Sequence, residues 1–599
     1  MRPDHMKLLK KARSLDRAGD HAGAAKAYST FLALEPKQSG VWADYAGQLV
    51  QLGRSDEALA ACHTALELAP RCLSARNNLG CILMWRDQLD EADQQFRTVL
   101  TADRKRLDAR LNLAECLLKK KDRPGTRKTL EEAGAVLSST FPHLSVRHAT
   151  QWADLGHALL EARDFRGAAD ACNQALQIDP TNLVAKVKLG AIRMAEGALE
   201  DAEAHFRHLI AKHPDRTDVR LLLINCLARK GDYGHCDREI AEVQHLAPRS
   251  FEVHTSVTAT CFAHGRWDGF RAEVARYRAL NVQTHPGLDP QNFLDLEEGF
   301  MDLLFGDMPK GWQRYEARLK LPKALRPKRT FDQPPWDGAS FQGKTLLVWA
   351  EQGLGDTLMF LRYLPQVKAL GGRVIVETQP SLVTVAATCS GSDEVVPKGE
   401  TLPLFDLQVS LMSLPRVFRT DLRSIPDSVP YLNIPREVPN REAILRRLEA
   451  ARESTRIGVV WAGSPGHVRD IERSLPMDAL APLADLPGVV WYNFQLDRRE
   501  APPLPNLIAL GPLLSSFADT AYALSGMDLL ITVDTSIAHL AGALGIPTLL
   551  LLSFTPDFRW LLGREDSPWY PSVRLYRQAT YGDWASVIQK VGADLCQEG

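Results

Sequence analysis

This sequence has almost no net charge, few long apolar runs and no cysteine motif. The 599 residues hold 72 Lys and Arg against 73 Asp and Glu, for a formal net charge of -1. A chain this close to neutral is not expected to bind a polyanion or a strongly anionic membrane through its overall charge. Residues 1–7 lack the apolar core of a secretory signal. The most apolar region, 540–554, is interrupted by Gly545 and Pro547 and is too short to span a bilayer.

The ten cysteines form no CxxC pair and no compact framework, and eight of them lie in the first half of the chain. Disulfide scaffolds depend on compact, paired spacings, so we expect free thiols and a cytoplasmic location. No Asp-x-Asp motif follows a predicted strand, so neither a metal nor another cofactor is expected. A chain of this length should form two to four domains.

A 34-residue period is present in the first half. Helix-breaking prolines, small residues and glycines recur in phase with one another. They are Pro36, Pro70, Pro180, Pro214 and Pro248, then Ala24, Ala58, Ala92, Ala168 and Ala202, and finally Gly80, Gly156 and Gly190. The glycines stand beside a recurring leucine, at a place where two helices must approach closely.

This period and pattern resemble the tetratricopeptide repeat (TPR), a helix-turn-helix unit that buries its apolar face only by stacking. Trp42 and Trp152 match the aromatic start of the motif. Seven repeats fit between about residues 5 and 248, with a degenerate eighth to about 282. The phase slips by eight residues around 138–147, which predicts a longer loop or a bend. We assign residues 1–285 to an α-solenoid, a TPR superhelix that recruits an acceptor.

Two asparagines mark one inward-facing position of adjacent repeats, Asn78 and Asn112. In some related solenoids such asparagines hold the backbone of an extended peptide, so the resemblance implies acceptor binding here. The alternative is that both are ordinary polar surface residues. Asp154, Lys188 and Leu222 at the equivalent sites do not continue the series.

Regular strand–helix alternation begins after a helical and proline-rich connector, 286–339. Strands are expected at 344–349, 373–378, 406–410 and 431–434, then at 456–461, 489–494 and 529–533. We expect two doubly wound, Rossmann-like α/β domains, 340–437 and 454–599, joined by a linker at 438–453. Ligands bind at the carboxyl ends of such strands, so the two domains should face each other across a cleft.

Three motifs in this half resemble glycosyltransferase family 9, the heptosyltransferase family, whose fold is GT-B. They are EQGLGDTL at 351–358, VVWAGSP at 459–465 and VDTSIAHL at 533–540. The match covers about residues 343–591. The whole architecture resembles bacterial TPR-fused glycosyltransferases, including those that modify flagellin in the cytoplasm before its export.

The resemblance implies that Asp356 is the catalytic base. An acceptor hydroxyl is a poor nucleophile, and a carboxylate within hydrogen-bond reach can take its proton as the new bond forms. Gly353 and Gly355 would let the backbone approach the substrates closely. The alternative role for Asp356 is a helix N-cap, and the two roles are compatible.

Asp534 matches the family residue that contacts the donor sugar. Thr535 and Ser536 would offer hydroxyls and N–H groups to a diphosphate at a helix start, where the helix dipole favours an anion. A simple N-cap is the alternative. His539, one turn further, is grouped with the donor site and expected to be a structural hydrogen-bonding residue rather than an acid.

Gly463 and Ser464 form a loop after a strand and are candidates for a phosphate cradle. Arg473 stands where heptosyltransferases carry a basic residue that neutralises the leaving phosphate, and arginine binds phosphate bidentately. Arg469 is the competing candidate, since the loop length is ambiguous. Either arginine could also be a solvated surface charge.

The leading hypothesis is an inverting, metal-independent glycosyltransferase that modifies Ser or Thr hydroxyls of a protein recruited by the solenoid, with flagellin the first candidate. The alternatives are a glycan or lipopolysaccharide heptosyltransferase and a catalytically silent scaffold. The donor, a nucleotide sugar, could be an ADP-heptose or a CMP-linked nonulosonic acid. By analogy with the family, the aromatic segment 554–570 should line the cleft and a helix at 584–596 should cross back over the first α/β domain.

Overall fold

The chain forms two compact units, Met1–Ala241 and Glu242–Gly599. The computed structural model describes residues 3–17, 20–120, 122–139, 146–161, 164–281, 289–321, 329, 331–449, 454–463, 470–496 and 501–598. None of the helices within these ranges is long and apolar enough to cross a membrane. The ten cysteines all lie within the described ranges and are all free.

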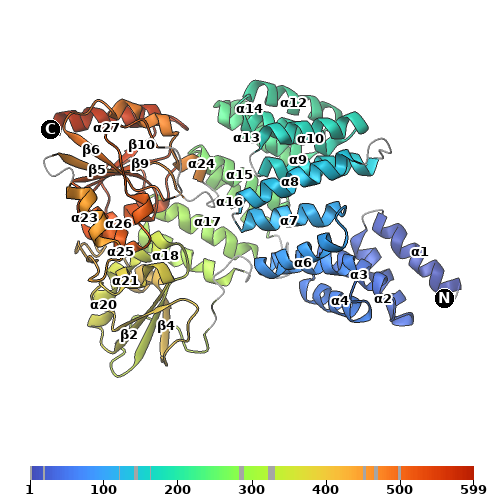
Figure 1. Cartoon of the computed structure of the whole chain (residues 1–599), viewed down its shortest axis with the longest axis horizontal. Helices are drawn as coiled ribbons and strands as arrows, with labels where there is room; N and C mark the ends of the chain where they lie inside the picture. The colour runs from blue at the N-terminus through green and yellow to red at the C-terminus, as the bar shows by residue number, and fades with distance from the viewer. Residues whose placement is uncertain are drawn as a thin grey trace. The chain divides into compact units, whose positions relative to one another are not determined.

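Antiparallel helix pairs fill the first unit and the beginning of the second (Figure 1). The helices are α1 Pro3–Arg17, α2 His21–Leu34, α3 Ser39–Gln51, α4 Ser55–Leu68, α5 Leu73–Trp85, α6 Leu89–Ala102, α7 Leu107–Lys119, α8 Arg123–Ser138, α9 Val146–Glu161, α10 Phe165–Ile178, α11 Leu183–Ala195, α12 Leu199–Lys212, α13 Thr217–Lys230, α14 Tyr233–Leu246, α15 Phe251–Ala263 and α16 Trp267–Ala279. The predicted helical solenoid is therefore present.

Small residues let the helices of a pair approach closely, as the repeat pattern predicted. A Cβ added to Gly80 would stand 2.5 Å from Phe96 Cε1, and one added to Gly190 would stand 2.4 Å from Phe206 Cε1. The in-phase alanines are fully buried. The stacking core therefore depends on paired small and large residues at a 34-residue spacing.

A recurring side-chain donor closes the turn between successive repeats, at the fourth position of the first helix of a repeat. In each case it donates to the carbonyl six residues earlier. The bonds are Trp42 Nε1 to Pro36 O at 2.8 Å, Arg76 Nη2 to Pro70 O at 2.9 Å, Arg110 Nη2 to Arg104 O at 2.5 Å and Arg220 Nε to Pro214 O at 3.2 Å. An arginine thus replaces the aromatic residue of the motif without loss of the contact.

The fourth pair accommodates its unexpected proline. Pro124 lies in the first turn of α8, where a missing N–H removes no helical hydrogen bond. Asp122 caps that helix by accepting a hydrogen bond from Gly125 N at 3.0 Å. The predicted loop around 138–147 lies mostly outside the described residues.

The repeat pattern continues along the chain beyond the end of the first compact unit. The compact units divide within α14, so α15 and α16 pack with the second unit although they continue the repeat series. Thr555 Oγ1, far along the chain, donates to the carbonyls of Phe262 at 3.1 Å and Ala263 at 3.0 Å. Two further helices, α17 Pro290–Leu304 and α18 Met308–Tyr315, lead from α16 to the sheets.

The first sheet is parallel, in the order β3-β2-β1-β4. Its strands are β1 Thr345–Trp349, β2 Arg373–Thr378, β3 Glu394–Pro397 and β4 Leu407–Ser410. The helices among and after them are α19 Leu354–Phe360, α20 Leu364–Ala369, α21 Val383–Ala386, α22 Leu414–Val417 and α23 Arg441–Glu449. The strand order reverses between β1 and β4, so a crevice is expected at their carboxyl ends.

The second sheet is also parallel, in the order β10-β9-β8-β5-β6-β7. Its strands are β5 Thr455–Val460, β6 Val489–Asn493, β7 Ile508–Ala509, β8 Leu529–Val533, β9 Thr548–Leu552 and β10 Val573–Arg577. Its helices are α24 Asp470–Arg473, α25 Phe517–Leu524, α26 Ser536–Leu544 and α27 Trp584–Glu598. This is the Rossmann strand order, with the reversal between β5 and β8.

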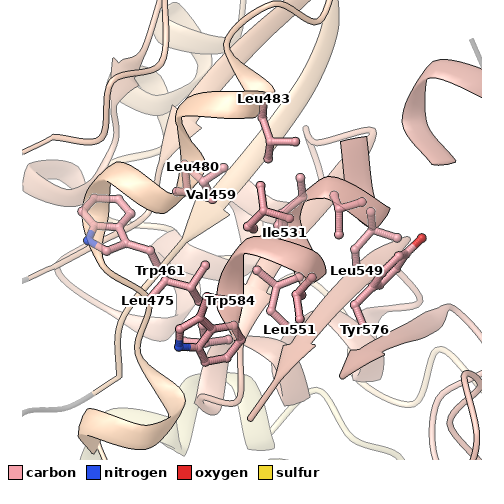
Figure 2. Close-up of a cluster of buried hydrophobic side chains, with 14 of the residues drawn as sticks. Val459, Trp461, Leu475, Leu480, Leu483, Ile531, Leu549, Leu551, Tyr576 and Trp584 are labelled. Carbon is pink, nitrogen blue, oxygen red and sulfur yellow. The ribbon is translucent and has the colours of Figure 1, made fainter. Parts of the chain in front are cut away.

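The final helix corrects one prediction. Trp584, Val587, Ile588 and Val591 of α27 are buried in the core of the second sheet, together with Tyr576 of β10. Figure 2 shows Trp584 and Tyr576 in this cluster with side chains of the central strands. The expected return of this helix over the first α/β domain is therefore wrong, because its apolar face is used within its own domain.

The strand predictions also had errors. Residues 431–434, expected to form a strand, have no regular structure and instead place Tyr431 and Leu432 in the core. Strands β3, β7 and β10 were missed; the four residues of β3 and the two residues of β7 give little periodicity.

Candidate functional site

The carboxyl ends of β5 and β8 border the reversal point of the second sheet, and the second and third motifs stand there. Asp534 and Thr535 directly follow β8, and Gly463 closely follows β5. Arg473, at the end of α24, donates from Nη1 to the carbonyl oxygen of Asp534 at 2.9 Å and so spans the crevice. The predicted donor residues described by the structure therefore lie together.

Gly463 is tightly enclosed. A Cβ at this position would stand 2.5 Å from Asp470 Oδ1 and 2.6 Å from Arg473 Nη2, so only glycine fits without displacing the arginine. Its N–H donates to Ser474 Oγ at 3.0 Å. Ser464 and Arg469 lie outside the described residues, and between the two competing arginines only Arg473 can be placed.

Asp534 is a carboxyl group in unusual surroundings. Burial and the nearby Asp557 carboxylate raise its pKa to about 6, although Arg473, the Trp560 indole and Arg559 act in the opposite direction. The group therefore changes charge close to neutral pH. Such perturbed groups in a crevice are candidates for ligand contact.

Thr535 is the N-cap residue of α26, but its side chain makes no cap hydrogen bond. Its Oγ1 is buried and has no hydrogen-bond partner within the described ranges. Buried hydroxyls are ordinarily satisfied, so this unused donor at a helix start is a candidate for contact with a bound anion. Ser536, the first residue of α26, is half-buried beside it.

Asp356 lies in the first turn of α19, just after β1. Its Oδ2 accepts the N–H of Gly353 at 2.7 Å; Gly353 is the N-cap residue, so Asp356 is the third residue of α19 and not the N-cap itself. Its Oδ1 accepts a hydrogen bond from Nη2 of Arg559. The carboxylate is about one-fifth exposed, at 18%, so an acceptor can still reach it.

The two glycines near Asp356 differ in what they contact. A Cβ at Gly355 would stand 2.7 Å from His539 Cδ2, so this glycine allows α19 to pack against α26. Gly353 is exposed, and a Cβ there would meet only Asp356 Oδ2 at 3.1 Å. The close approach expected at Gly355 is thus to another helix of the protein.

His539 is buried and held by two aromatic residues. Its Nδ1 forms a 3.0 Å hydrogen bond with the Tyr570 hydroxyl, and its ring stacks on Trp560 at 5.2 Å between centroids. Burial and the positive charges of Arg559 and Arg362 lower its pKa to about 3. It is therefore neutral at physiological pH and positions α26 rather than donating protons.

The loop before Asp356 is anchored by a buried carboxylate. Glu351 Oε1 accepts hydrogen bonds from Arg318 Nε at 2.9 Å and from Ser410 Oγ at 2.5 Å. Because Ser410 ends β4, this contact spans the reversal point of the first sheet. The loop carrying Asp356 is consequently fixed to the sheet on both sides.

Arg559 was missed as a site residue by sequence reasoning. It lies in the short 3-10 helix η7, Phe558–Trp560, after β9, and joins Asp356 to the second sheet. Its neighbours Phe558 and Trp560 are buried, so the aromatic residues of this segment form core and the arginine reaches the crevice. The signal that could have found it is a single cation in an aromatic run just beyond the most apolar region of the chain, 540–554.

The two asparagines of the solenoid already use their amide nitrogens. Asn78 Nδ2 donates to Ala43 O at 3.0 Å, and Asn112 Nδ2 donates to Asn77 Oδ1 at 3.2 Å. Both side chains are half-buried. An amide nitrogen carries two N–H groups, so Asn78 can still offer a second N–H, as well as its oxygen, to a bound peptide.

Comparison with protein families decides the nature of the repeats. Residues 9–71 match one tetratricopeptide-repeat model, and residues 159–204 and 193–260 match another. TPR repeats are therefore present in these parts of the solenoid. Among solved structures, a TPR protein from Parabacteroides merdae is 12% identical, with a TM-score of 0.33 over 43% of this chain and 98% of that one. A thermophilic TPR protein from Thermus thermophilus is 22% identical, with a TM-score of 0.27 over 32% and 99%.

One curated relative matches about half of the chain. Protein FlbA of Caulobacter vibrioides is 27% identical over 321 residues, which make up 49% of this chain and 53% of FlbA. This chain therefore spans about half the length of that relative.

Proposed function

We propose that the chain is a GT-B glycosyltransferase, which transfers a sugar from a nucleotide-sugar donor to a hydroxyl of a protein held by its TPR repeats. One observation carries the proposal. A carboxylate at the start of α19 and the start of α26 lie at the carboxyl ends of two parallel sheets, and Arg559, which follows β9, pairs with that carboxylate. Two facing crevices of this kind suit two substrates of one transfer reaction.

On the donor side, the diphosphate would lie against the start of α26. The N–H groups of the first turn, the unused Thr535 hydroxyl and Arg473 can share its negative charge. Fixed donors and a cation at this place stabilise the leaving nucleoside diphosphate, and they do so without a metal. Asp534, which follows β8, would accept hydrogen bonds from the sugar.

On the acceptor side, Asp356 would take the proton of the attacking hydroxyl. The oxygen then bonds to the anomeric carbon, while the bond to the phosphate oxygen breaks and its electron pair leaves with the nucleotide. Attack opposite to the leaving group inverts the configuration. The Gly353 N–H holds the carboxylate in place at 2.7 Å, so its orientation is set before the acceptor arrives.

The TPR repeats supply the protein acceptor, because stacked repeats form extended surfaces for binding other proteins. Flagellin is the acceptor that the resemblance to TPR-fused glycosyltransferases favours, which would place the reaction in the cytoplasm. The sugar is not identified by the site, since base and sugar recognition depends on loops around it.

The test compares the mass of flagellin purified from cells with the wild-type protein, with Asp356→Asn, and without the protein. We expect an added sugar mass on Ser or Thr with the wild type, and an in vitro rate lowered at least about a hundredfold by Asp356→Asn. Asp406→Asn is the matched control, because this exposed aspartate binds Thr345 N at the opposite end of the same sheet. A normal single-turnover rate in Asp356→Asn would reject the proposal.

A further inference from the structure

Arg559 lies between two carboxylates at the crevice. Its Nη2 donates to Asp356 Oδ1, and its Nη1 donates to Asp557 Oδ1 at 2.5 Å. The arginine side chain is only 9% exposed, so water screens these charges weakly. A buried cation of this kind is stable only while an anion stays beside it.

Aromatic residues pack against the side chain of Arg559 and hold its neighbour Phe558 in place. Its guanidinium lies 4.4 Å from the Phe558 ring centre, and Phe558 packs edge-on against Trp312 at 5.7 Å. Within the same guanidinium, Nε is buried and has no hydrogen-bond partner in the described part of the chain. The guanidinium therefore has an unused donor while its backbone is held still.

The beginning of α26 is close to this ion pair. Gly355, next to Asp356, packs directly against His539 of α26. The charge of Arg559 also acts on both His539 and Asp534. A diphosphate bound at the start of α26 would thus be a second anion within the field of the same arginine.

While Arg559 remains paired with Asp356, each oxygen of this carboxylate already accepts a hydrogen bond, Oδ2 from the Gly353 N–H and Oδ1 from Arg559 Nη2. An acceptor hydroxyl must donate its own hydrogen bond to one of these oxygens, so Arg559 competes with it for Oδ1 while Asp557 remains as a second partner of the arginine. We propose that the bound donor resolves this: Arg559 transfers its pairing from Asp356 to the diphosphate, and only then can Asp356 accept the proton of the acceptor hydroxyl. This inference rests on the proposed function and adds an order to it, with donor binding first.

Competition for Arg559 has a measurable consequence that a permanent ion pair between Asp356 and Arg559 would not have. If Asp356 and the diphosphate compete for Arg559, removing the charge of Asp356 must strengthen diphosphate binding. We expect Asp356→Asn in the full chain to bind inorganic pyrophosphate at least about fivefold more tightly, the lower range of coupling between sites. Isothermal titration calorimetry measures this. Asp528→Asn, which removes a partner of Arg456 at the other end of the second sheet, should leave affinity unchanged.

A double-mutant cycle separates competition from plain loss of negative charge. In an Arg559→Gln background, Asp356→Asn should no longer change pyrophosphate affinity. If circular dichroism shows that Arg559→Gln is unfolded, Arg559→Lys is used as the background instead. In that background, we expect Asp356→Asn to raise pyrophosphate affinity by less than it does in the wild type. An unchanged or weaker affinity in Asp356→Asn, or a gain that persists without Arg559, overturns the role of Arg559 and leaves the glycosyltransferase proposal standing. Failure of pyrophosphate, ADP, CMP and UDP all to bind the wild type overturns both.

Discussion

Single residues at the crevice show what motifs can and cannot predict. The positions of Asp356, Asp534 and Gly463 followed from their place after apolar strands, because parallel strands bring their carboxyl ends to one edge. Their proposed roles stay predictions. Arg559 could not be found in this way, because its reach to Asp356 depends on aromatic packing between segments far apart in the chain. Pairings of that kind leave no local pattern.

Gly355 and Gly353 give a matched test at this scale. Gly355→Ala should lower the free energy of unfolding by about 1–3 kcal/mol, the usual cost of overpacking, because His539 is held by Tyr570 and cannot yield. Gly353→Ala should change it by less than about 0.5 kcal/mol, as expected at an exposed site. Urea unfolding followed by tryptophan fluorescence measures both. Equal effects of the two substitutions would contradict the packing argument.

Sequence periodicity predicted helices and strands best where these elements are long and repeated. The 34-residue spacing predicted helix pairs through α16, and buried glycines and alanines confirm the close packing it implied. The same pattern could not predict that α15 and α16 pack with the second unit, since that depends on contacts such as Thr555 with Phe262. For α27, the sequence indicated an apolar face but not that this face packs on the second sheet.

Three helices, α15 to α17, meet at a buried histidine. His254 Nδ1 and Nε2 form hydrogen bonds with Glu273 at 3.2 Å and Glu297 at 2.8 Å, and its ring stacks on Tyr277. Burial would lower the pKa of His254, but these two hydrogen bonds outweigh it and raise the pKa above 6.5. Burial would raise the pKa of Glu273, but Arg276 and His254 outweigh it and lower it below 4.5.

The sign of the pH dependence follows from these shifts. The stabilisation from His254 is complete below about pH 6.5 and is lost as pH rises through the raised pKa; that from Glu273 is complete above about pH 4.5 and is lost on acidification. Thr258, Gln244, Phe251 and Phe293 surround the cluster and do not titrate in this range. We expect α15–α17 to resist hydrogen exchange most strongly between these limits.

Substitution of the histidine tests this cluster. His254→Gln should weaken α15–α17 by roughly 3 kcal/mol, the scale of a broken buried ion pair, and remove the loss of protection above neutral pH. His235→Gln, whose pairing with Asp232 is exposed, should cost less than about 1 kcal/mol. Hydrogen exchange read by mass spectrometry reports each helix separately. A pH profile that His254→Gln leaves unaltered would exclude the histidine as its source.

At the level of the whole molecule, the boundary of the compact units decides where the chain can be divided. A fragment of residues 232–599 keeps α14 to α16 and should bind pyrophosphate as the full chain does. A fragment beginning at 286 loses the partners of Thr555 and Glu297 and should aggregate or unfold. Light scattering and calorimetry distinguish the two fragments. A stable, pyrophosphate-binding 286–599 fragment would show that the predicted domain boundary at 285 is the functional one.

The longer fragment also tests recruitment. Without the repeats before α14, residues 232–599 should modify an intact protein acceptor poorly, because tethering raises the local acceptor concentration to roughly millimolar. Rates are compared at equal protein and acceptor concentrations. An undiminished rate would favour a glycan acceptor over a recruited protein.

The donors that close the turns between repeats also set how the solenoid can flex. Where Trp42, Arg76, Arg110 and Arg220 hold the preceding carbonyl, the joint is stiff. Trp152 has the same place in the repeat register but is the seventh residue of the longer helix α9, and its indole nitrogen is buried without a hydrogen-bond partner in the described ranges. The repeats of the solenoid should thus form stiff segments with a more flexible joint at α9. Bending at this joint would let the solenoid close around a bound polypeptide.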